Sequence, residues 1–414
     1  VIVKISLRHT IVLLLMLAVN LNAETTYYVD AGRSDDDGDG SSWAEAKQYL
    51  QSALALAVEG DEIWVAAGVY YPDEGVGSSN NNKSQKFLIQ NSIKVYGGFE
   101  GNEAEISDRE KRDKDGDGIV QPWEFTNVST STGIHFKSKS ASSEHWDTHV
   151  DENVLDGFTI TGNTAGPIWR YGGVTDQAMA VVNAGTIANC IIKDNNLYGV
   201  YSAKIIMNSI IRDNRYGAED VETVTGCVIN NNLDYGIKNV ETVISSVISG
   251  NPGTGIKNPR TVVNSRISGN GDGGIEGGDM TLTNCTITGN YKYKNGSNGG
   301  AGGIYITMST RNVSLTNCIV WGNSYEHYYE SFSSALNDAQ QGMMIGHDEI
   351  FMYDAGDGSG SITFVLAKTV FANTDEAQEF FYTDNALAVF NDCCTELQWA
   401  LVNDGDSLAT GVKY

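Results

Sequence analysis

The stretch from Asp113 to Glu124, DKDGDGIVQPWE, has the residue types and spacing of a calcium-binding loop of the EF-hand kind. Calcium prefers oxygen ligands, and such a loop supplies them from positions 1, 3, 5, 7, 9 and 12, with glycine at position 6 for a sharp turn. Gly118 takes that glycine position. The six ligand positions are filled by Asp113, Asp115, Asp117, the Ile119 carbonyl, Gln121 and a bidentate Glu124. We expect Ca2+ here as a lone structural clip that orders a long loop; the alternative is a solvated acidic loop.

A second acidic stretch, SDDDGDG at residues 34–40, repeats part of this rhythm. Asp35, Asp37 and Asp39 would take the first three ligand positions, but position 12 falls on Ala46, which offers no carboxylate. We therefore predict a solvated loop, and keep a second, weaker metal site as the alternative.

Three basic residues are weak candidates for catalysis. A polysaccharide lyase needs a Lys or Arg that abstracts the proton next to a carboxylate, beside acidic residues that hold calcium. Lys193 and Arg212 occupy the same place in two successive repeats, each followed by Asp, and Arg266 is expected on the same outer surface. Charged residues on an outer surface often only form ion pairs with one another and contact solvent, and this interpretation is favoured here. The catalytic residues, if there are any, therefore stay unknown.

Tyr198, Tyr216 and Tyr235 stand at matching places in three successive repeats. They should stack, and an outward stack would form a platform for sugar rings. An inward or corner position would make them packing residues, which is the favoured interpretation. Nearby acidic residues, Glu219 among them, are expected to make this flank acidic.

A repeat positions these candidates. The similar segments NCIIKDN, NSIIRDN, GCVINNN, SSVISGN, NSRISGN and NCTITGN begin at residues 189, 208, 226, 245, 264 and 284. A period near 19 with β-branched runs and turn residues predicts a β-solenoid, because a strand–helix–strand unit needs about 30 residues. Stacked coils would pair in parallel, about 4.8 Å apart.

Strand alternation assigns each segment's side chains to a face. An inward aliphatic ladder is predicted at Ile160, Ile192, Ile211, Ile229, Ile248, Ile267, Ile287 and Val320. Each segment ends in an Asn that tolerates a left-handed turn and can bond to its neighbours along the tube: Asn163, Asn195, Asn214, Asn232, Asn251, Asn270, Asn290 and Asn323.

The cysteines are expected to be free thiols. Cys190 and Cys227 lie two coils apart, about 9.6 Å by strand spacing, which is too far for a disulfide. Cys285 and Cys318 lie on adjacent coils, where in-register side chains seldom present suitable vectors. The state of the Cys393–Cys394 pair stays open.

The chain ends carry other signals. A capping box at residues 42–45 and apolar residues at helical spacing predict a short N-terminal capping helix from Trp43 that Gly60 stops. We divide the chain as follows: 1–23 a secretory signal, 24–101 the cap and first coils, 102–153 an insertion holding the calcium loop, 154–323 regular coils, and 324–414 irregular final coils or a C-terminal cap.

The charge excludes one class of partner. Lys and Arg number 27 against 52 Asp and Glu, a net charge of −25. Nucleic acid is not an expected partner, because such binding depends on basic contacts to phosphate. No apolar run is long enough to span a bilayer. The signal predicts a protein that is secreted or held at the cell surface, and we expect a monomer.

The stretches YYVD (27–30), LQSALALAVEGDEIWVAAGVYYPD (50–73) and IKVYGGFEGNE (93–103), followed by GFTITGN-type repeats, resemble bacterial exported right-handed parallel β-helix repeat proteins of the pectin lyase-like fold. The resemblance covers about residues 26–325 and implies an all-β fold. It is weak for function, because the fold carries lyases, hydrolases and adhesins. We predict a scaffold that binds a carbohydrate or another cell-surface polymer; the alternative is a calcium-dependent polysaccharide lyase or glycoside hydrolase.

Overall fold

The computed structural model describes residues 24–75, 85–90, 92–136, 152–163, 169–170, 173–174, 179–292, 301–306, 311–321, 323–325, 350–352, 362–367, 370–371 and 386–391. The expected signal at residues 1–23, most of residues 324–414, and Cys393 and Cys394 lie outside this part of the chain.

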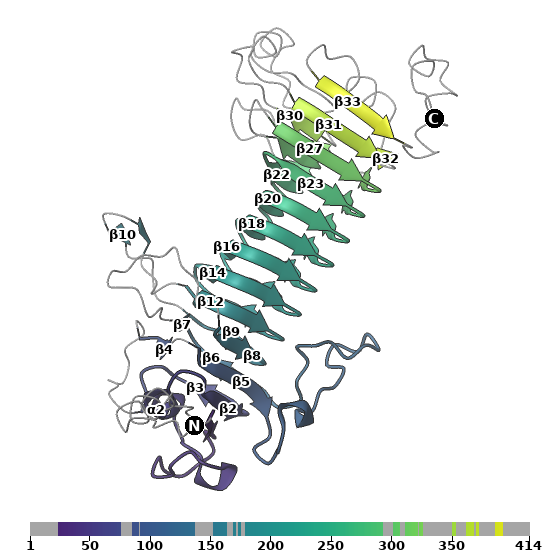
Figure 1. Cartoon of the computed structure of the whole chain (residues 1–414). Coiled ribbons are helices and arrows are strands. Elements are labelled where there is room, and N and C mark those ends of the chain that lie inside the picture. Colours follow the sequence, from purple (N-terminus) through teal and green to yellow (C-terminus); the bar gives the residue numbers. More distant parts are fainter. Residues whose placement is uncertain are drawn as a thin grey trace, which may run out of the picture.

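The strands of the two large sheets stack in parallel along one straight axis, as Figure 1 shows, whereas the short pair at residues 169–170 and 173–174 is antiparallel. One sheet of 18 strands forms the long side of the tube. It contains β1 Thr26–Val29, β2 Glu62–Ala66, β4 Phe87–Ile89, β5 Lys94–Phe99, β7 Ile134–Phe136, β8 Val154–Asp156, β12 Val181–Ala188, β14 Tyr198–Met207, β16 Tyr216–Thr225, β18 Ile237–Ile244, β20 Ile256–Val263, β22 Ile275–Gly277, β23 Met280–Thr283, β26 Ile304–Ile306, β27 Arg311–Thr316, β30 Ile350–Met352, β31 Ile362–Ala367 and β33 Ala386–Asn391.

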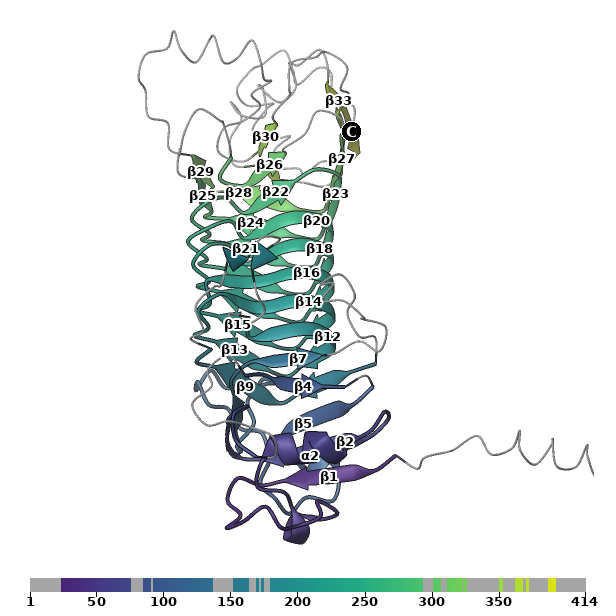
Figure 2. The same cartoon turned by 90° about the vertical axis from the view of Figure 1, so that its left-hand side faces the viewer.

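A second sheet of 11 short strands closes the other side (Figure 2). It contains β3 Gly68–Tyr70, β6 Ser129–Ser131, β9 Phe158–Thr161, β13 Ile191–Lys193, β15 Ile210–Arg212, β17 Val228–Asn230, β19 Val247–Ser249, β21 Arg266–Ser268, β24 Thr286–Thr288, β28 Ile319–Trp321 and β32 Val370–Phe371. Two small pairs, β10 Trp169–Arg170 with β11 Gly173–Val174 and β25 Tyr291–Lys292 with β29 Ser324–Tyr325, lie outside these sheets. The expected right-handed parallel β-helix is confirmed.

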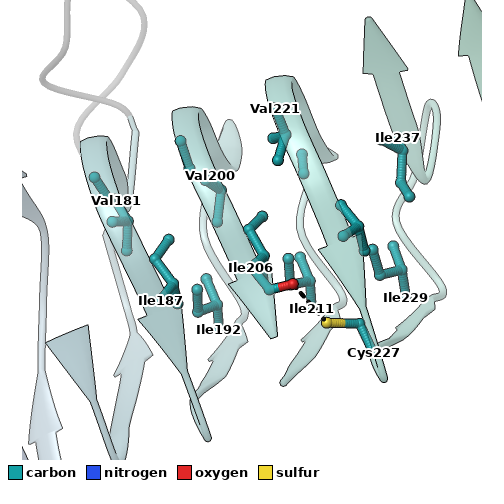
Figure 3. Packing of buried hydrophobic residues seen from close by; sticks show 14 of the residues in the cluster. Val181, Ile187, Ile192, Val200, Ile206, Ile211, Val221, Cys227, Ile229 and Ile237 are labelled. Carbon is teal, nitrogen blue, oxygen red and sulfur yellow. Dashed lines mark hydrogen bonds between the residues drawn. The ribbon is translucent and has the colours of Figure 1, made fainter. Parts of the chain in front are cut away.

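The core is the predicted ladder of aliphatic side chains. Ile192 pairs with Ile211, and Ile211 with Ile229, in exact register, and all three are fully buried. Figure 3 shows these side chains facing Val200, Ile206 and their neighbours from the long sheet across the inside of the tube. Cys190, Cys227, Cys285 and Cys318 are buried free thiols in the same core, as expected.

The predicted asparagine ladder is also present. From Asn195 to Asn290 each side-chain amide donates to the carboxamide oxygen of the next asparagine, for example Asn214 to Asn232 at 3.1 Å and Asn232 to Asn251 at 3.1 Å. At the first asparagine of the ladder, Asn163, the side-chain amide donates to the Met179 carbonyl instead. One detail of the prediction is wrong: the left-handed backbone falls on the residue before the asparagine, such as Asp213 at φ 56° and Asn231 at φ 55°. The asparagine side chain can therefore turn inward and stay buried.

The N-terminal cap is shorter than predicted. Trp43–Glu45 forms a single 3-10 turn (η1), and the α-helix, α2, spans only Leu50–Leu56. The helix does not run on from Trp43, because Ala46 is extended and Lys47 forms a parallel bridge to Val29. A second 3-10 turn, η2 Ile106–Asp108, precedes the calcium loop. No helix in the described part of the chain has both the length and the apolar character needed to cross a membrane.

Candidate calcium loop and surface groove

The predicted calcium loop lies at the tip of a two-stranded ribbon between η2 and β6. The Arg112 amide donates to the Glu124 carbonyl at 3.0 Å, and the Thr126 amide donates to the Glu110 carbonyl at 2.8 Å. Extended backbone therefore flanks the loop where an EF-hand has helices. The sharp turn expected at Gly118 is present, with φ 85°.

Three carboxylates gather in this loop. One oxygen from each of Asp113, Asp115 and Asp117 lies within 4.8 Å of the others. The Asp113 carboxylate accepts from the backbone amides of Gly118 at 2.9 Å and Gly116 at 2.6 Å. These bonds lower the pKa of Asp113, so its carboxylate is ionised over the whole neutral range. An all-oxygen donor set of this kind fits calcium.

The remaining predicted ligands lie around this group rather than within it. The Glu124 carboxylate accepts from the backbone amides of Gln121 at 2.8 Å and Lys114 at 2.9 Å, which lowers its pKa. The Gln121 amide nitrogen is 3.5 Å from an Asp117 oxygen. Ile119 is exposed, with its backbone amide bound to Asp117. Three of the six predicted ligands are thus brought together directly.

The base of the ribbon is fixed to the tube. Arg109 donates to the Asp156 carboxylate at 2.6 Å and to the Gly97 carbonyl at 2.8 Å. Its guanidinium lies over the buried Phe125 ring, 4.7 Å from the centroid. The loop is therefore tied to β8, where the regular coils begin.

The acidic stretch at residues 34–40 is arranged differently. Asp35 and Asp39 accept from the amides two residues ahead, at 3.3 and 2.8 Å. Within the described part of the chain, the carboxylates of Asp35, Asp37 and Asp39 do not gather as those of Asp113, Asp115 and Asp117 do. Asp36 instead accepts from the amides of Gln48 and Tyr49 and from the Ser52 hydroxyl, and so fixes the start of α2. The second metal site stays a prediction without geometric support.

The basic candidates do not converge. Lys193 and Arg212 are in register on β13 and β15, as predicted. The Lys193 ammonium lies 3.3 Å from the Asp194 carboxylate, and Arg212 forms an ion pair with Asp213. Arg266 is exposed on β21, three coils beyond β15 in the strand order and thus about 14 Å away.

A groove crosses three coils at the turns that follow these short strands. Its volume is about 810 Å³, and its lining comes from residues 194–196, 213, 215 and 233–234. Asp194, Asp213 and Asp234 supply carboxylates, and Arg215 supplies a guanidinium. Leu233 is 67% exposed beside them. Arg215, Leu233 and Asp234 were not predicted as part of a site from the sequence, although Arg215 and Leu233 directly follow the ladder asparagines Asn214 and Asn232.

The tyrosine ladder begins where the groove ends. The rings of Tyr198 and Tyr216 are 4.7 Å apart and those of Tyr216 and Tyr235 are 4.8 Å apart, so the predicted stacking is present. The Arg215 guanidinium lies 5.3 Å from the Tyr216 ring centroid. Tyr198 and Tyr216 are partly exposed and Tyr235 is buried, which leaves two rings reachable from outside.

Glu219 does not lie on an acidic outer surface beside the tyrosines, as the sequence had suggested. It is buried, accepts from the Tyr235 hydroxyl, and pairs with the Lys238 ammonium at 2.6 Å. Burial and the bond to Glu219 raise the pKa of Tyr235 far above its usual range. Glu219 therefore holds Tyr235 in place as a neutral hydrogen-bond donor. The negative charge of the Glu219 carboxylate is balanced by the Lys238 ammonium.

Comparisons with protein-family models and with curated proteins found no match. Among solved structures, pectate lyase Pel9A is similar at 13% identity and TM-score 0.35, over 90% of this chain and 78% of the lyase. XylC, solved with xylose, is similar at 11% identity and TM-score 0.42, over 89% of this chain and 86% of XylC. The Agl-KA catalytic domain is similar at 15% identity and TM-score 0.40, over 89% of this chain and 68% of that domain. Similarity at this level carries no argument about function, and the parallel β-helix is established by the chain's own strand pairing.

Proposed function

We propose that this protein is an exported β-helix scaffold that binds a neutral polysaccharide segment in the groove lined by residues 194–196, 213, 215 and 233–234, with Ca2+ ordering the loop at residues 113–124. The observation that carries the proposal is the groove itself, which crosses three coils beside stacked tyrosines. Its length along the tube follows the strand spacing of about 4.8 Å per coil, so an extended polymer can contact the same residue types repeatedly.

The chemistry of the groove suits sugar hydroxyls. Asp194, Asp213 and Asp234 can accept hydrogen bonds from hydroxyl groups, and Arg215 can donate them. Leu233 offers an apolar surface for the C–H face of a sugar ring, and the Tyr216 ring lies directly behind Arg215. Three carboxylates in one groove repel uronates, which favours a neutral glycan over an acidic one.

Calcium is proposed as a structural ion. The gathered carboxylates of Asp113, Asp115 and Asp117 supply the oxygen ligands that calcium prefers, and Arg109 and Phe125 tie the ribbon below them to the tube. Binding there would neutralise like charges that otherwise repel one another. The residues of this loop do not line the groove, so the ion is not assigned a role in contacting the ligand.

The competing function, a calcium-dependent lyase or a hydrolase, has less support. Lys193 and Arg212 are ion-paired with the neighbouring aspartates and do not line the groove, whereas a catalytic base must reach the proton of a bound substrate. Arg266 lies three coils away. New ultraviolet absorbance from an unsaturated product, lost in Lys193→Ala, would favour the lyase instead.

Affinity electrophoresis tests the proposal. Native gels would contain a neutral polymer (xylan, glucomannan or soluble glucan) or an acidic one (pectate or alginate). We expect at least one neutral polymer to slow the wild-type chain, and Asp213→Ala to weaken that retardation about tenfold. Asp220→Ala is the matched control, because Asp220 is exposed and its carboxylate bonds to Asn239 outside the groove. Equal retardation of both variants, or no retardation by any neutral polymer, would refute groove binding.

A further inference from the structure

A second surface of the tube carries two columns of uncharged side chains over five coils, bordered on one side by the accessible charged residues Glu222, Glu241 and Arg260. The outward residues on the last part of β16, β18, β20, β23 and β27 form two columns, side by side. The first column is Thr223, Thr242, Thr261, Thr281 and Ser314, and the second is Thr225, Ile244, Val263, Thr283 and Thr316. We call these ten residues the threonine face. Figure 1 shows the strands that carry it in one regular stack.

The face is solvent-accessible and rigid. All ten side chains are partly or fully exposed, while the residues between the two columns, such as Val243 and Val262, are buried in the core. Nine of the ten are β-branched, and such side chains have few rotamers, so their hydroxyls and methyls stay in fixed positions. The register continues without a break from Thr223 to Ser314.

The spacing forms a two-dimensional lattice. Neighbouring coils lie about 4.8 Å apart along the tube, and the two columns lie two residues apart on each strand, about 6.7 Å. Both distances are close to the repeats of water oxygens on the prism planes of hexagonal ice. A free sheet would twist out of such a plane, whereas closed coils with a bonded asparagine ladder keep successive strands aligned.

We propose that the threonine face binds ice. The hydroxyls hydrogen-bond to waters at lattice positions, and the methyl groups between them order the waters that they cannot bond. The preference of β-strands for β-branched residues explains why Thr, Val and Ile are common on this face. It does not explain why none of the ten residues is charged. Another column of the same sheet carries the buried Glu219 and the partly exposed Lys238, Lys257 and Glu276 in register, so these strands accept charged residues.

A crystalline polysaccharide fits the face less well. Proteins commonly hold sugar rings against aromatic side chains, and none of the ten residues is aromatic. The lack of charge likewise disfavours an ionic partner. This inference does not depend on the groove, which lies at the turns after the short strands.

The test is thermal hysteresis and inhibition of ice recrystallisation, measured on the full chain at micromolar concentration. We expect the wild type to show both, and Thr261→Lys to lower the hysteresis at least fivefold. Ser268→Lys is the matched control, because it places the same side chain on an outward position of the same coil, on β21. If Thr261→Lys fails to fold, Thr242→Lys gives the same comparison one coil away.

Three outcomes would overturn the proposal. One is a wild type that does not alter ice growth. Another is an equal loss of hysteresis in Thr261→Lys and Ser268→Lys when both have the wild-type melting temperature. The last is binding to microcrystalline cellulose that Thr261→Lys abolishes while ice growth is unaffected by either protein.

Discussion

Single asparagines in the ladder hold several buried groups at once. The Asn232 amide donates to the Asn251 oxygen at 3.1 Å and to the Ile211 carbonyl at 3.1 Å, and its own oxygen accepts from Asn214. Removing this side chain leaves buried partners unsatisfied, and each such group costs about 1–3 kcal/mol. Asn232→Ala should therefore lower the free energy of unfolding by roughly 3 kcal/mol in urea titrations followed by circular dichroism.

The exposed ladder provides the control for this prediction. Asn239 also bonds to its neighbours, donating to Asp220 at 2.9 Å and accepting from Asn258 at 3.0 Å, but water can replace these partners. Because the Asn239 backbone is left-handed, with φ 53°, the control variant is Asn239→Gly, which is expected to cost less than about 1 kcal/mol. Similar losses in the two variants would show that burial of the inner ladder contributes little.

At the scale of the element, the loop at residues 113–124 should respond to calcium. In calorimetric titration we expect one tight site in the wild type and none in Asp113→Ala, with a rise in melting temperature on calcium addition in the wild type alone. Asp37→Ala, in the other acidic stretch, is the control that should leave uptake unchanged. If the Asp113→Ala variant binds calcium as the wild type does, the loop at residues 113–124 is not the calcium site.

The pH dependence of this loop follows from its hydrogen bonds. Backbone amides lower the pKa of both Asp113 and Glu124, so these carboxylates favour the folded loop when ionised. Their contribution is fully present above the ordinary carboxyl pKa values near 4 and is lost as the pH falls through the lowered values. Calcium affinity should accordingly stay almost constant from pH 7 to pH 5 and fall steeply below about pH 4. A midpoint near pH 6 would contradict this assignment.

The elements show what a sequence with a period can and cannot predict. Ile192, Ile211 and Ile229 recur at one place per coil, so their inward ladder and parallel register followed from spacing alone. The helix boundary was wrong because Asp36, distant in sequence from Ser52, fixes where α2 begins. The burial of Glu219 likewise depends on Tyr235 from the next coil, a contact that no local pattern contains.

The candidate site also contains features that the sequence predicts and features that depend on contacts between coils. The three gathered carboxylates were predictable because their spacing lies within one loop. The groove was not, because Asp194, Arg215 and Leu233 come from three coils and act together only once the tube is formed. Likewise, the threonine face requires the register of β16 with β18 and β20, which decides that Thr223, Thr242 and Thr261 share one column.

At the scale of the whole molecule, each coil contacts chiefly its two neighbours, so a defect should stay local. Ile248 is fully buried on β19, between Ile229 of β17 and Ile267 of β21. Ile248→Ala leaves a cavity there and should cost about 2–5 kcal/mol. Hydrogen exchange should then speed up most in β17, β19 and β21, and hardly at all in β2 and β5 near the N-terminal end of the tube. A uniform increase along the chain would instead mean that the β-helix opens as a single cooperative unit, and that stability measured at one coil reports on every other.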